Sequence, residues 1–250
     1  MELLTCTITG ADDHVNISDM ERLSREYPFA EWALLLSPSS NPMTVADVGK
    51  PRYPTMKRML DLLTNHEDMN YSVHLCKDYV ESFLSGNSTL WWMLSYADRV
   101  QLNINCMSAA PGIENRMVMG ITQFASTMRG RKVLGMNVIT QQNISNTMLT
   151  EYLLKSEYDR TLLRDAHQVL FDSSGGKGVE AKTFKAPYHN VVCGYAGGLG
   201  PSNLEYALGE IERIAGDEQV WTDMESAVRT NNELDLQKVE ECLRITSRHL

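Results

Sequence analysis

Two periodicities of hydrophobic and polar residues alternate along almost the whole chain. Short runs rich in aliphatic and aromatic residues predict β-strands. The segments between them place apolar residues every three or four positions, as on one face of a helix. We predict eight strands, at Leu3 to Ile8, Trp32 to Leu36, Tyr71 to Cys76, Arg99 to Asn103, Met136 to Thr140, Gln168 to Phe171, Val191 to Gly194 and Gln219 to Thr222.

The predicted helices carry recognisable start signals. Ser18-Asp19-Met20-Glu21 has the form of a capping box ahead of Leu23. Pro54 stands just before apolar residues that fall on one helical face. The segment from Pro38 to Pro51 is a long loop by composition, and no clear long helix lies between Phe171 and Val191. Further helices are predicted at Ile113 to Met128, Ile144 to Leu154, Asn203 to Ile214 and Leu236 to Ile245.

This order of elements limits the fold class. Strands that alternate with helices predict a parallel sheet, because parallel neighbours need crossover connections. Eight such units in 250 residues fit a closed (β/α)8 barrel, or TIM barrel, in which residues 1–250 form a single domain. A doubly wound open sheet is the alternative that the pattern leaves open.

The net charge and the length of the apolar runs limit the classes of partner that we expect. A formal net charge of −9 argues against nucleic-acid binding, which needs a basic surface. No apolar run approaches the length of a membrane span, and Glu2 stands where a secretory signal carries basic residues. We therefore expect a cytoplasmic monomer or homodimer that binds neither nucleic acid nor membranes.

The cysteines and histidines show no spacing typical of a metal site. Five cysteines, an odd number, are scattered without a CxxC pair. This usage is typical of free thiols in a reducing compartment. The six histidines show no ligand spacing either. We expect no metal and no other cofactor.

A glycine-rich turn near the C-terminus is the most informative local feature. The run Val191 to Gly194 leads into Ala196-Gly197-Gly198-Leu199, after which Pro201 opens a predicted helix. Bare backbone N–H groups at Gly197 and Gly198, with the positive end of the following helix, would form an anion site. Such turns also cap helices or form hairpins.

The predicted position of this turn favours a phosphate. In a barrel, residues just past each strand face the active site, and the loops after the seventh and eighth strands recurrently bind phosphate. The eighth predicted strand leads into Asp223-Met224-Glu225-Ser226-Ala227, whose Asp223 or Ser226 can alternatively cap a helix. The predicted phosphate-binding residues are Gly197, Gly198, Ser226 and Ala227.

Two other strands carry candidate catalytic groups. Cys6 lies in the first strand, where a cysteine is otherwise a small buried hydrophobic residue. Asp172 follows the sixth strand and leads into a glycine-rich loop that contains Gly175 and Gly176. An aspartate at such a place otherwise serves as a turn or cap residue.

In their order along the chain, these segments resemble the phosphoribosylanthranilate isomerase family, a TIM-barrel family of tryptophan biosynthesis. The family reads K-I-C-G-I-T in its first strand, S-P-R-Y after the second, V-Q-L-H in the fourth and A-G-G-L after the seventh. The segments similar to these four motifs are, in the same order, Leu4-Thr5-Cys6-Thr7-Ile8-Thr9, Lys50-Pro51-Arg52-Tyr53, Val100-Gln101-Leu102-Asn103 and Ala196-Gly197-Gly198-Leu199. Two further segments are also similar to the family. They are Asp172 with Gly175-Gly176 and Lys182-Thr183-Phe184 after the sixth strand, and Asp223-Met224-Glu225-Ser226-Ala227-Val228-Arg229 after the eighth.

The resemblance implies an isomerase of amino-acid biosynthesis that catalyses the Amadori rearrangement of a small phosphorylated substrate, a phosphoribosyl-amine. It implies Cys6 as the general base and Asp172 as the general acid, without a metal or redox cofactor. It also implies that Arg52 pairs with an aromatic carboxylate of the substrate. The other residues expected to bind substrate are Gln101, Gly175 and Gly176.

The chain departs from the family pattern at several positions. Thr7 replaces the glycine after the base, Glu225 replaces a serine, and Ala227 replaces a glycine. Extra residues between Ser37 and Lys50 separate Arg52 from its strand. Two alternatives therefore stay open. One is a barrel that binds or sequesters a phosphorylated sugar or nucleotide-like ligand without turnover, and the other is a scaffold without a ligand.

Overall fold

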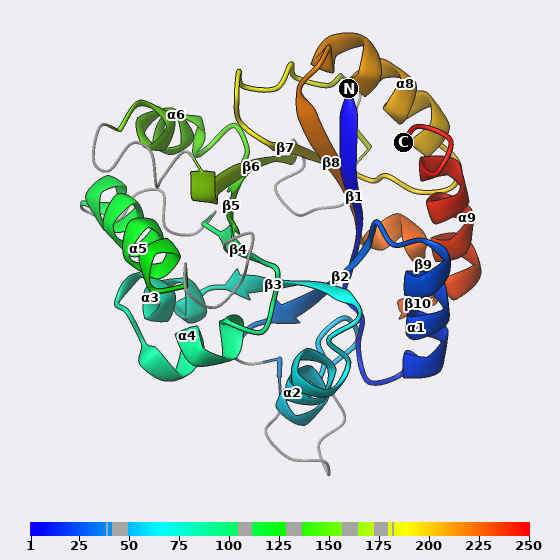
Figure 1. The fold of residues 1–250 in the computed structure, drawn as a ribbon, viewed down its shortest axis with the longest axis horizontal. Coiled ribbons are helices and arrows are strands. Elements are labelled where there is room, and N and C mark those ends of the chain that lie inside the picture. Colours follow the sequence, from blue (N-terminus) through cyan, green and yellow to red (C-terminus); the bar gives the residue numbers. More distant parts are fainter. Residues whose placement is uncertain are drawn as a thin grey trace.

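Eight parallel strands close into a barrel in the computed structural model of the chain, with helices around the outside (Figure 1). The structure describes residues 1–38, 40–41, 50–104, 112–128, 137–156, 165–172, 180–181 and 183–250. Each strand pairs with its neighbours in sequence order, and β1 pairs with β8 to close the ring. The fold is therefore the predicted (β/α)8 barrel, and the open-sheet alternative is wrong.

The strands lie where the sequence pattern predicts them, with small shifts at their ends. They are β1 (Glu2–Thr9), β2 (Ala30–Leu36), β3 (Asn70–Cys76), β4 (Arg99–Asn103), β5 (Asn137–Gln142), β6 (His167–Asp172), β7 (Cys193–Ala196) and β8 (Gln219–Met224). The seventh differs most, because Val191 and Val192 precede the paired segment rather than form part of it.

Six of the described helices lie where the periodicity predicts them, with small shifts at their ends, and two more, not predicted, lie between the third and fourth strands. They are α1 (Ile17–Glu26), α2 (Met56–Asn65), α3 (Asp78–Leu84), α4 (Ser88–Leu94), α5 (Ile113–Met128), α6 (Thr147–Lys155), α8 (Leu204–Ala215) and α9 (Leu236–Thr246). The Asn16 side chain, not Ser18, caps α1 by accepting from the Ser18 amide. Pro201 stands in a turn before α8 rather than inside it.

A short segment that the pattern does not predict follows β8. It consists of a single 3₁₀ turn (Ser226–Val228) and a two-stranded hairpin of β9 (Arg229–Thr230) and β10 (Glu233–Leu234). The Asp235 side chain then caps α9 by accepting from the Gln237 and Lys238 amides.

The barrel interior and the layer beneath the helices are separate environments. Ile139, Leu170 and Trp221 form a small apolar cluster apart from the main core, which lies between strands and helices. Gly194 makes room for Trp221, because a Cβ atom there would lie 2.2 Å from Trp221 Cε2. Many other inward positions are polar, as the hydrogen bond from Thr7 Oγ1 to Glu31 Oε1 shows (2.9 Å).

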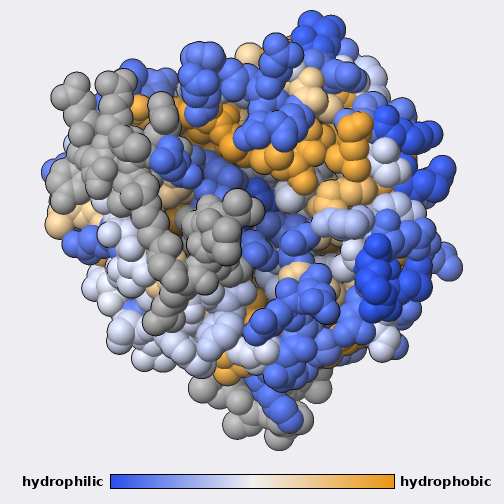
Figure 2. Space-filling view, viewed as in Figure 1, coloured by the Kyte–Doolittle hydropathy of each residue, from blue (hydrophilic) through white to orange (hydrophobic). Residues whose placement is uncertain are grey.

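The molecular surface on the face of Figure 1 is uneven in character. Figure 2 shows hydrophobic residues gathered in a band along one side of this face, over the region where β6, β7 and β8 lie in Figure 1. Hydrophilic residues surround that band and extend into the central hollow. No helix in the described part of the chain is long and apolar enough to cross a membrane.

Candidate active site

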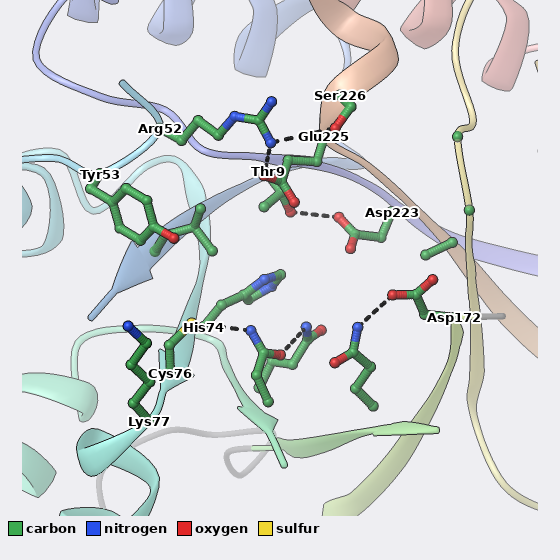
Figure 3. A pocket seen from close by; sticks show the side chains of 17 residues that line it. Thr9, Arg52, Tyr53, His74, Cys76, Lys77, Asp172, Asp223, Glu225 and Ser226 are labelled. Carbon is green, nitrogen blue, oxygen red and sulfur yellow. Dashed lines mark hydrogen bonds and ion pairs between the residues drawn. The ribbon is translucent and has the colours of Figure 1, made fainter. Parts of the chain in front are cut away.

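A pocket of about 360 Å³ opens where the carboxyl ends of the strands meet (Figure 3). This is the end of a parallel barrel at which enzymes of the fold hold their substrates. Its walls come from every strand end and from the segments that follow β2, β3, β7 and β8. The lining residues are Thr9, Leu35, Arg52, Tyr53, His74, Cys76, Lys77, Gln101, Asn103, Gln141, Asp172, Ala196, Gly197, Gly198, Asp223, Glu225 and Ser226.

A buried ion pair closes the barrel below this pocket. Arg99 of β4 donates to Glu31 of β2 through Nε (2.7 Å) and Nη2 (2.6 Å). The same guanidinium donates to Gln168 Oε1 (3.0 Å) and lies 4.0 Å over the Trp221 ring. Both charges are almost fully buried, and such a pair is tolerated only when its hydrogen bonds are satisfied. The floor of the pocket is therefore a closed polar layer.

Asp223, near the end of β8, is buried against Thr9 of β1. The Thr9 hydroxyl donates to Asp223 Oδ1 over 2.5 Å. Burial raises the pKa of Asp223 to about 7, helped by the negative charges of Glu225 and Asp172 and opposed by the Thr9 bond. A carboxyl group that exchanges its proton near neutral pH is suited to general acid or base catalysis.

Asp172, the last residue of β6, lies on the same wall of the pocket as Gly197 and Gly198. The side-chain Nε2 atom of Gln141 donates to Asp172 Oδ2 over 2.5 Å, which holds the carboxylate toward the cavity (Figure 3). The effect of Asp172 on the pKa of Asp223 shows that the two carboxyl groups are electrostatic neighbours. The pocket thus contains a pair of interacting carboxylates.

Two polar side chains line the pocket beside the carboxylates. Burial lowers the pKa of His74 to about 3, so its ring is neutral and can donate or accept a hydrogen bond. The predicted substrate-binding residue Gln101 donates to Asn103 Oδ1 (2.9 Å). Its own Oε1 atom is buried without a hydrogen-bond partner among the described residues. Gln101 also lines the pocket, so its side chain is placed beside a ligand there.

The glycine-rich turn after β7 borders the pocket as the sequence predicts. Gly197 has φ = 120° and Gly198 has φ = 65°, values that L side chains rarely adopt. The carbonyl oxygens of the two glycines accept from the Ala181 amide (3.1 Å) and Asn203 Nδ2 (3.0 Å) respectively. These bonds hold the turn in place.

Two residues in the loop after β8 are predicted to bind phosphate, and one of them lines the pocket. Ser226 lines the pocket, whereas Ala227 is not among the lining residues. Ala227 packs against Gly200 instead, since a Cβ atom on Gly200 would lie 2.5 Å from the Ala227 Cβ. Ala227 is also absent from the described non-glycine residues with positive φ, so the alanine imposes no backbone strain there.

Arg52 lies in the pocket, but on the wall that carries Ser226 and Glu225. Its Nη1 atom donates to Glu225 Oε1 (2.6 Å) and to Ser226 Oγ (3.4 Å). Its backbone, at φ = 81°, is held by the amide donating to Asp12 Oδ2 (2.7 Å). The guanidinium is therefore placed beside the proposed phosphate site and offsets the charge of Glu225.

Cys6 is not in this pocket, which corrects the prediction of a catalytic cysteine. Its side chain is fully buried on the outer side of β1, next to Thr222 of β8 and to Thr246 and Cys242 of α9. Burial raises the pKa of the thiol to about 12, so the thiolate is not formed near neutral pH. Inward and outward positions alternate along a strand, and Thr9, three residues later, faces the cavity instead.

Two of the predicted substrate-binding residues, Gly175 and Gly176, lie outside the described residues. Conversely, Asp223 was not predicted as a catalytic residue, only as one of two alternative helix caps, and His74 was not singled out. A signal for His74 was available, because inward positions of several strands carry polar residues at a spacing of two. Examples are Thr5, Thr7 and Thr9 in β1, Ser72, His74 and Cys76 in β3, and Arg99, Gln101 and Asn103 in β4.

A comparison with solved structures finds several chains of similar fold. The structure resembles that of N-(5'-phosphoribosyl)anthranilate isomerase from Pyrococcus furiosus, with a TM-score of 0.55 over 98% of this chain and 99% of that chain. The sequence identity is 12%, so the likeness establishes the barrel fold and a distant structural similarity. No protein-family model and no curated protein matches the sequence.

Proposed function

We propose that the protein is an isomerase that converts a phosphoribosyl-amine into the corresponding amino-ketose by an Amadori rearrangement. The observation that carries this proposal is the pair of interacting carboxylates, Asp172 and Asp223, in one pocket with the glycine-rich turn. The likeness to an isomerase of this class agrees with it in fold.

The chemistry needs one proton donor and one proton acceptor near the sugar. Protonation of the ring oxygen opens the ribosylamine to a Schiff base. Removal of the C2 proton then forms an enolamine, which tautomerises to the ketose. Acid–base catalysis of each step needs only groups that change protonation state close to neutral pH.

The environments of the two carboxylates suggest how they divide this work. Asp223 is buried, and its raised pKa of about 7 keeps a large fraction protonated, so it is the proposed acid. The side-chain amide of Gln141 holds the Asp172 carboxyl group toward the cavity, so Asp172 is the proposed base. Asp172 is thus the proposed base, whereas the family resemblance implies it as the acid. Asp223 takes the place of Cys6 in the pair.

The phosphate of the substrate would bind at Gly197, Gly198 and Ser226. Both glycines line the pocket, and hydrogen bonds from Ala181 and Asn203 to their carbonyl oxygens hold the turn there. Arg52 stands beside Ser226 and offsets the charge of Glu225, which would otherwise repel a phosphate. Gln101 Oε1 would accept from a sugar hydroxyl.

A turnover assay tests the proposal directly. The purified protein is incubated with phosphoribosylanthranilate, and loss of the substrate's fluorescence is followed. Asp172→Asn and Asp223→Asn should each lower kcat by about 10²-fold or more, because each removes a proton-transfer group. Cys6→Ala should retain wild-type kcat within about twofold, since its thiol lies outside the pocket. Full activity in both aspartate variants would disprove the proposed roles.

The displacement of Cys6 from the pocket also favours a second candidate. A barrel that lacks the family's expected base can bind a phosphorylated sugar or nucleotide-like ligand without converting it. Isothermal titration with ribose 5-phosphate and with phosphoribosylanthranilate distinguishes the two functions. Tight binding without product supports the binding protein, and turnover excludes it.

A further inference from the structure

Glu225 places a carboxylate inside the proposed phosphate site. It precedes Ser226 in the loop after β8, and both residues line the pocket. This loop packs against the end of the glycine-rich turn, because a Cβ atom on Gly200 would lie 2.5 Å from the Ala227 Cβ. In the family pattern a serine stands where this chain has Glu225. A negative charge at this place has no role in the proposed reaction.

One oxygen of the Glu225 carboxylate is paired within the protein and the other is not. Oε1 accepts from Arg52 Nη1 over 2.6 Å (Figure 3). Oε2 has no hydrogen-bond or ion-pair partner among the residues that the structure describes. The side chain is 30% exposed and forms part of the pocket wall. An ionised carboxylate only accepts hydrogen bonds, so a ligand group that bonds to Oε2 must carry a hydrogen.

Arg52 is fixed at its backbone and at its side chain, which keeps the ion pair in the site. Its amide donates to Asp12 Oδ2 (2.7 Å), and its Nε donates to Asn232 Oδ1 (3.1 Å). The buried Arg229 contacts both of these partners. Its Nη1 lies 3.7 Å from Asp12 Oδ2 and donates to the Asn232 carbonyl (2.8 Å). Three loops are thus joined around Arg52, and an anion that reaches its guanidinium also meets Glu225.

A carboxylate fixed in this way distinguishes anions that carry a proton from anions that do not. A fully ionised oxyanion has only acceptors, so its oxygens and Glu225 Oε2 repel each other. A singly protonated phosphate can instead donate its O–H to Oε2, in a charge-assisted hydrogen bond that is short and strong. Its remaining oxygens can accept from the glycine-rich turn, Ser226 and Arg52. A phosphate monoester loses this proton with a pKa of about 6.

Several titratable groups surround Glu225. Those that interact with its charge are Arg52, Tyr53, Asp223 and Arg229. The other titratable groups that line the pocket are His74, Cys76, Lys77 and Asp172. The charge of Glu225 helps burial to raise the pKa of Asp223 to about 7, so its field extends into the pocket. The proton of Asp223 therefore has to be separated from that of the ligand in any pH profile.

We propose that Glu225 makes the pocket selective for a singly protonated phosphate group over a fully ionised oxyanion of the same shape. The proposal rests on the proposed function for the position of the phosphate, at Gly197, Gly198 and Ser226. In the complex, the phosphate O–H donates to Glu225 Oε2, and the other phosphate oxygens accept from the turn, Ser226 and Arg52. The ligand of this barrel is therefore a phosphate monoester in its monoanionic form.

Isothermal titration of the full chain with inorganic phosphate and with sulfate at pH 6.5 tests this selectivity without turnover. Sulfate has the same tetrahedral shape but carries no proton at this pH. Wild type should bind phosphate at least about tenfold more tightly than sulfate, and Glu225→Gln should reduce this ratio to about twofold or less. Glu225→Ser should behave in the same way. Glu210→Gln is the matched control, because Glu210 also pairs with an arginine but does not line the pocket.

The pH dependence of ribose 5-phosphate binding is the second measurement. Wild-type affinity should fall by at least about tenfold between pH 6 and pH 8, as the phosphate group loses its proton. Glu225→Gln should remove this fall. Asp223→Asn lacks the other group that titrates in this range and should retain the fall, because Glu225 is still present.

Equal affinities of wild type for phosphate and sulfate would overturn the proposal, as would the absence of binding by either anion. A preference for phosphate that persists in both Glu225 variants, shown to be folded by circular dichroism, would overturn it as well. If phosphoribosylanthranilate is turned over although the two anions bind equally, the selectivity is wrong and the proposed function stands. If the selectivity is found but nothing is turned over, the proposed function fails and the selectivity stands.

Discussion

The barrel interior holds two layers of charged groups that are treated in opposite ways. In the lower layer, Arg99 and Glu31 are ion-paired, and the guanidinium forms further bonds to Gln168, Thr5 and Thr7. In the upper layer, Asp172 and Asp223 face one cavity and each accepts a bond from a neutral side chain. The lower layer neutralises its charge, and the upper layer leaves negative charges near one another.

This difference separates a structural cluster from a chemical one. Two opposite charges that are paired and fully hydrogen-bonded keep their protonation states at neutral pH. The Arg99–Glu31 pair therefore has a structural role in holding the strands of the barrel together. Burial and negative neighbours raise the pKa of Asp223 to about 7, so this carboxyl group can exchange its proton near neutral pH. A group whose pKa is shifted and that lies in a cleft is a candidate for function, whereas a charged pair in the closed floor of the barrel is not.

The largest expected effect comes from disruption of the lower layer. Arg99→Met leaves the Glu31 carboxylate buried without its cation and should lower the free energy of unfolding by about 3–5 kcal/mol. The double variant Arg99→Met/Glu31→Leu removes both charges and should recover most of that loss. Urea unfolding at pH 7 measures both. Equal destabilisation in the single and double variants would show that the pair is not what holds the floor.

Removal of charge from the upper layer should have the opposite sign. The pKa of Asp223 is raised from 3.8 to about 7 in the folded state, so its ionisation opposes folding. Its contribution to stability is present at low pH and is lost as pH rises from about 4 to 7. Relative to wild type, Asp223→Asn should gain roughly 2–4 kcal/mol between pH 4.5 and pH 8. A constant difference across that range would contradict the raised pKa.

His74 gives a smaller effect with the reverse pH dependence. Its pKa is lowered from 6.5 to about 3, so the unfolded chain binds a proton that the folded chain does not. Stability is therefore lost as pH falls below 6.5, by about 2 kcal/mol between pH 6.5 and pH 5. His74→Gln should flatten this part of the stability curve.

The smallest effect concerns the two cysteines that lie on either side of the barrel wall. Cys76 lines the pocket and is partly exposed, whereas Cys6 is buried beneath α9. Iodoacetamide should modify Cys76 within the time that leaves Cys6 unmodified, because only an accessible thiol can form the reactive thiolate. Peptide mass spectrometry of the alkylated native protein measures both. Modification of Cys6 at the rate of Cys76 would contradict its placement.

Sequence pattern was sufficient for the order of elements and for one wall of the site. Runs such as Trp32 to Leu36 and the helical period of Ile113 to Met128 are local signals, and the structure confirms them as β2 and α5. The Gly197-Gly198 turn was also recognisable, since its conformation depends on residues that lack a Cβ atom. These features are encoded within a few consecutive residues.

Which side chains of β1 face the pocket could not be predicted from a few consecutive residues. Cys6 and Thr9 stand on opposite faces of one strand, and either could have faced the pocket. A shift of one residue in register exchanges the two faces of a strand, and the β1–β8 pairing has such an irregularity between Leu3 and Cys6. That register is set by closure of the barrel across residues more than 200 positions apart.

By itself, therefore, the sequence determined the eightfold alternation of strands and helices, the polar character of several strand faces and the glycine-rich turn. Only the tertiary structure decided that Asp223 rather than Cys6 shares a cavity with Asp172, and that Arg52 pairs with Glu225. The physical reason is that local backbone preferences act over a few residues. The facing of side chains and the pKa of a buried carboxyl group depend instead on which distant strands surround it.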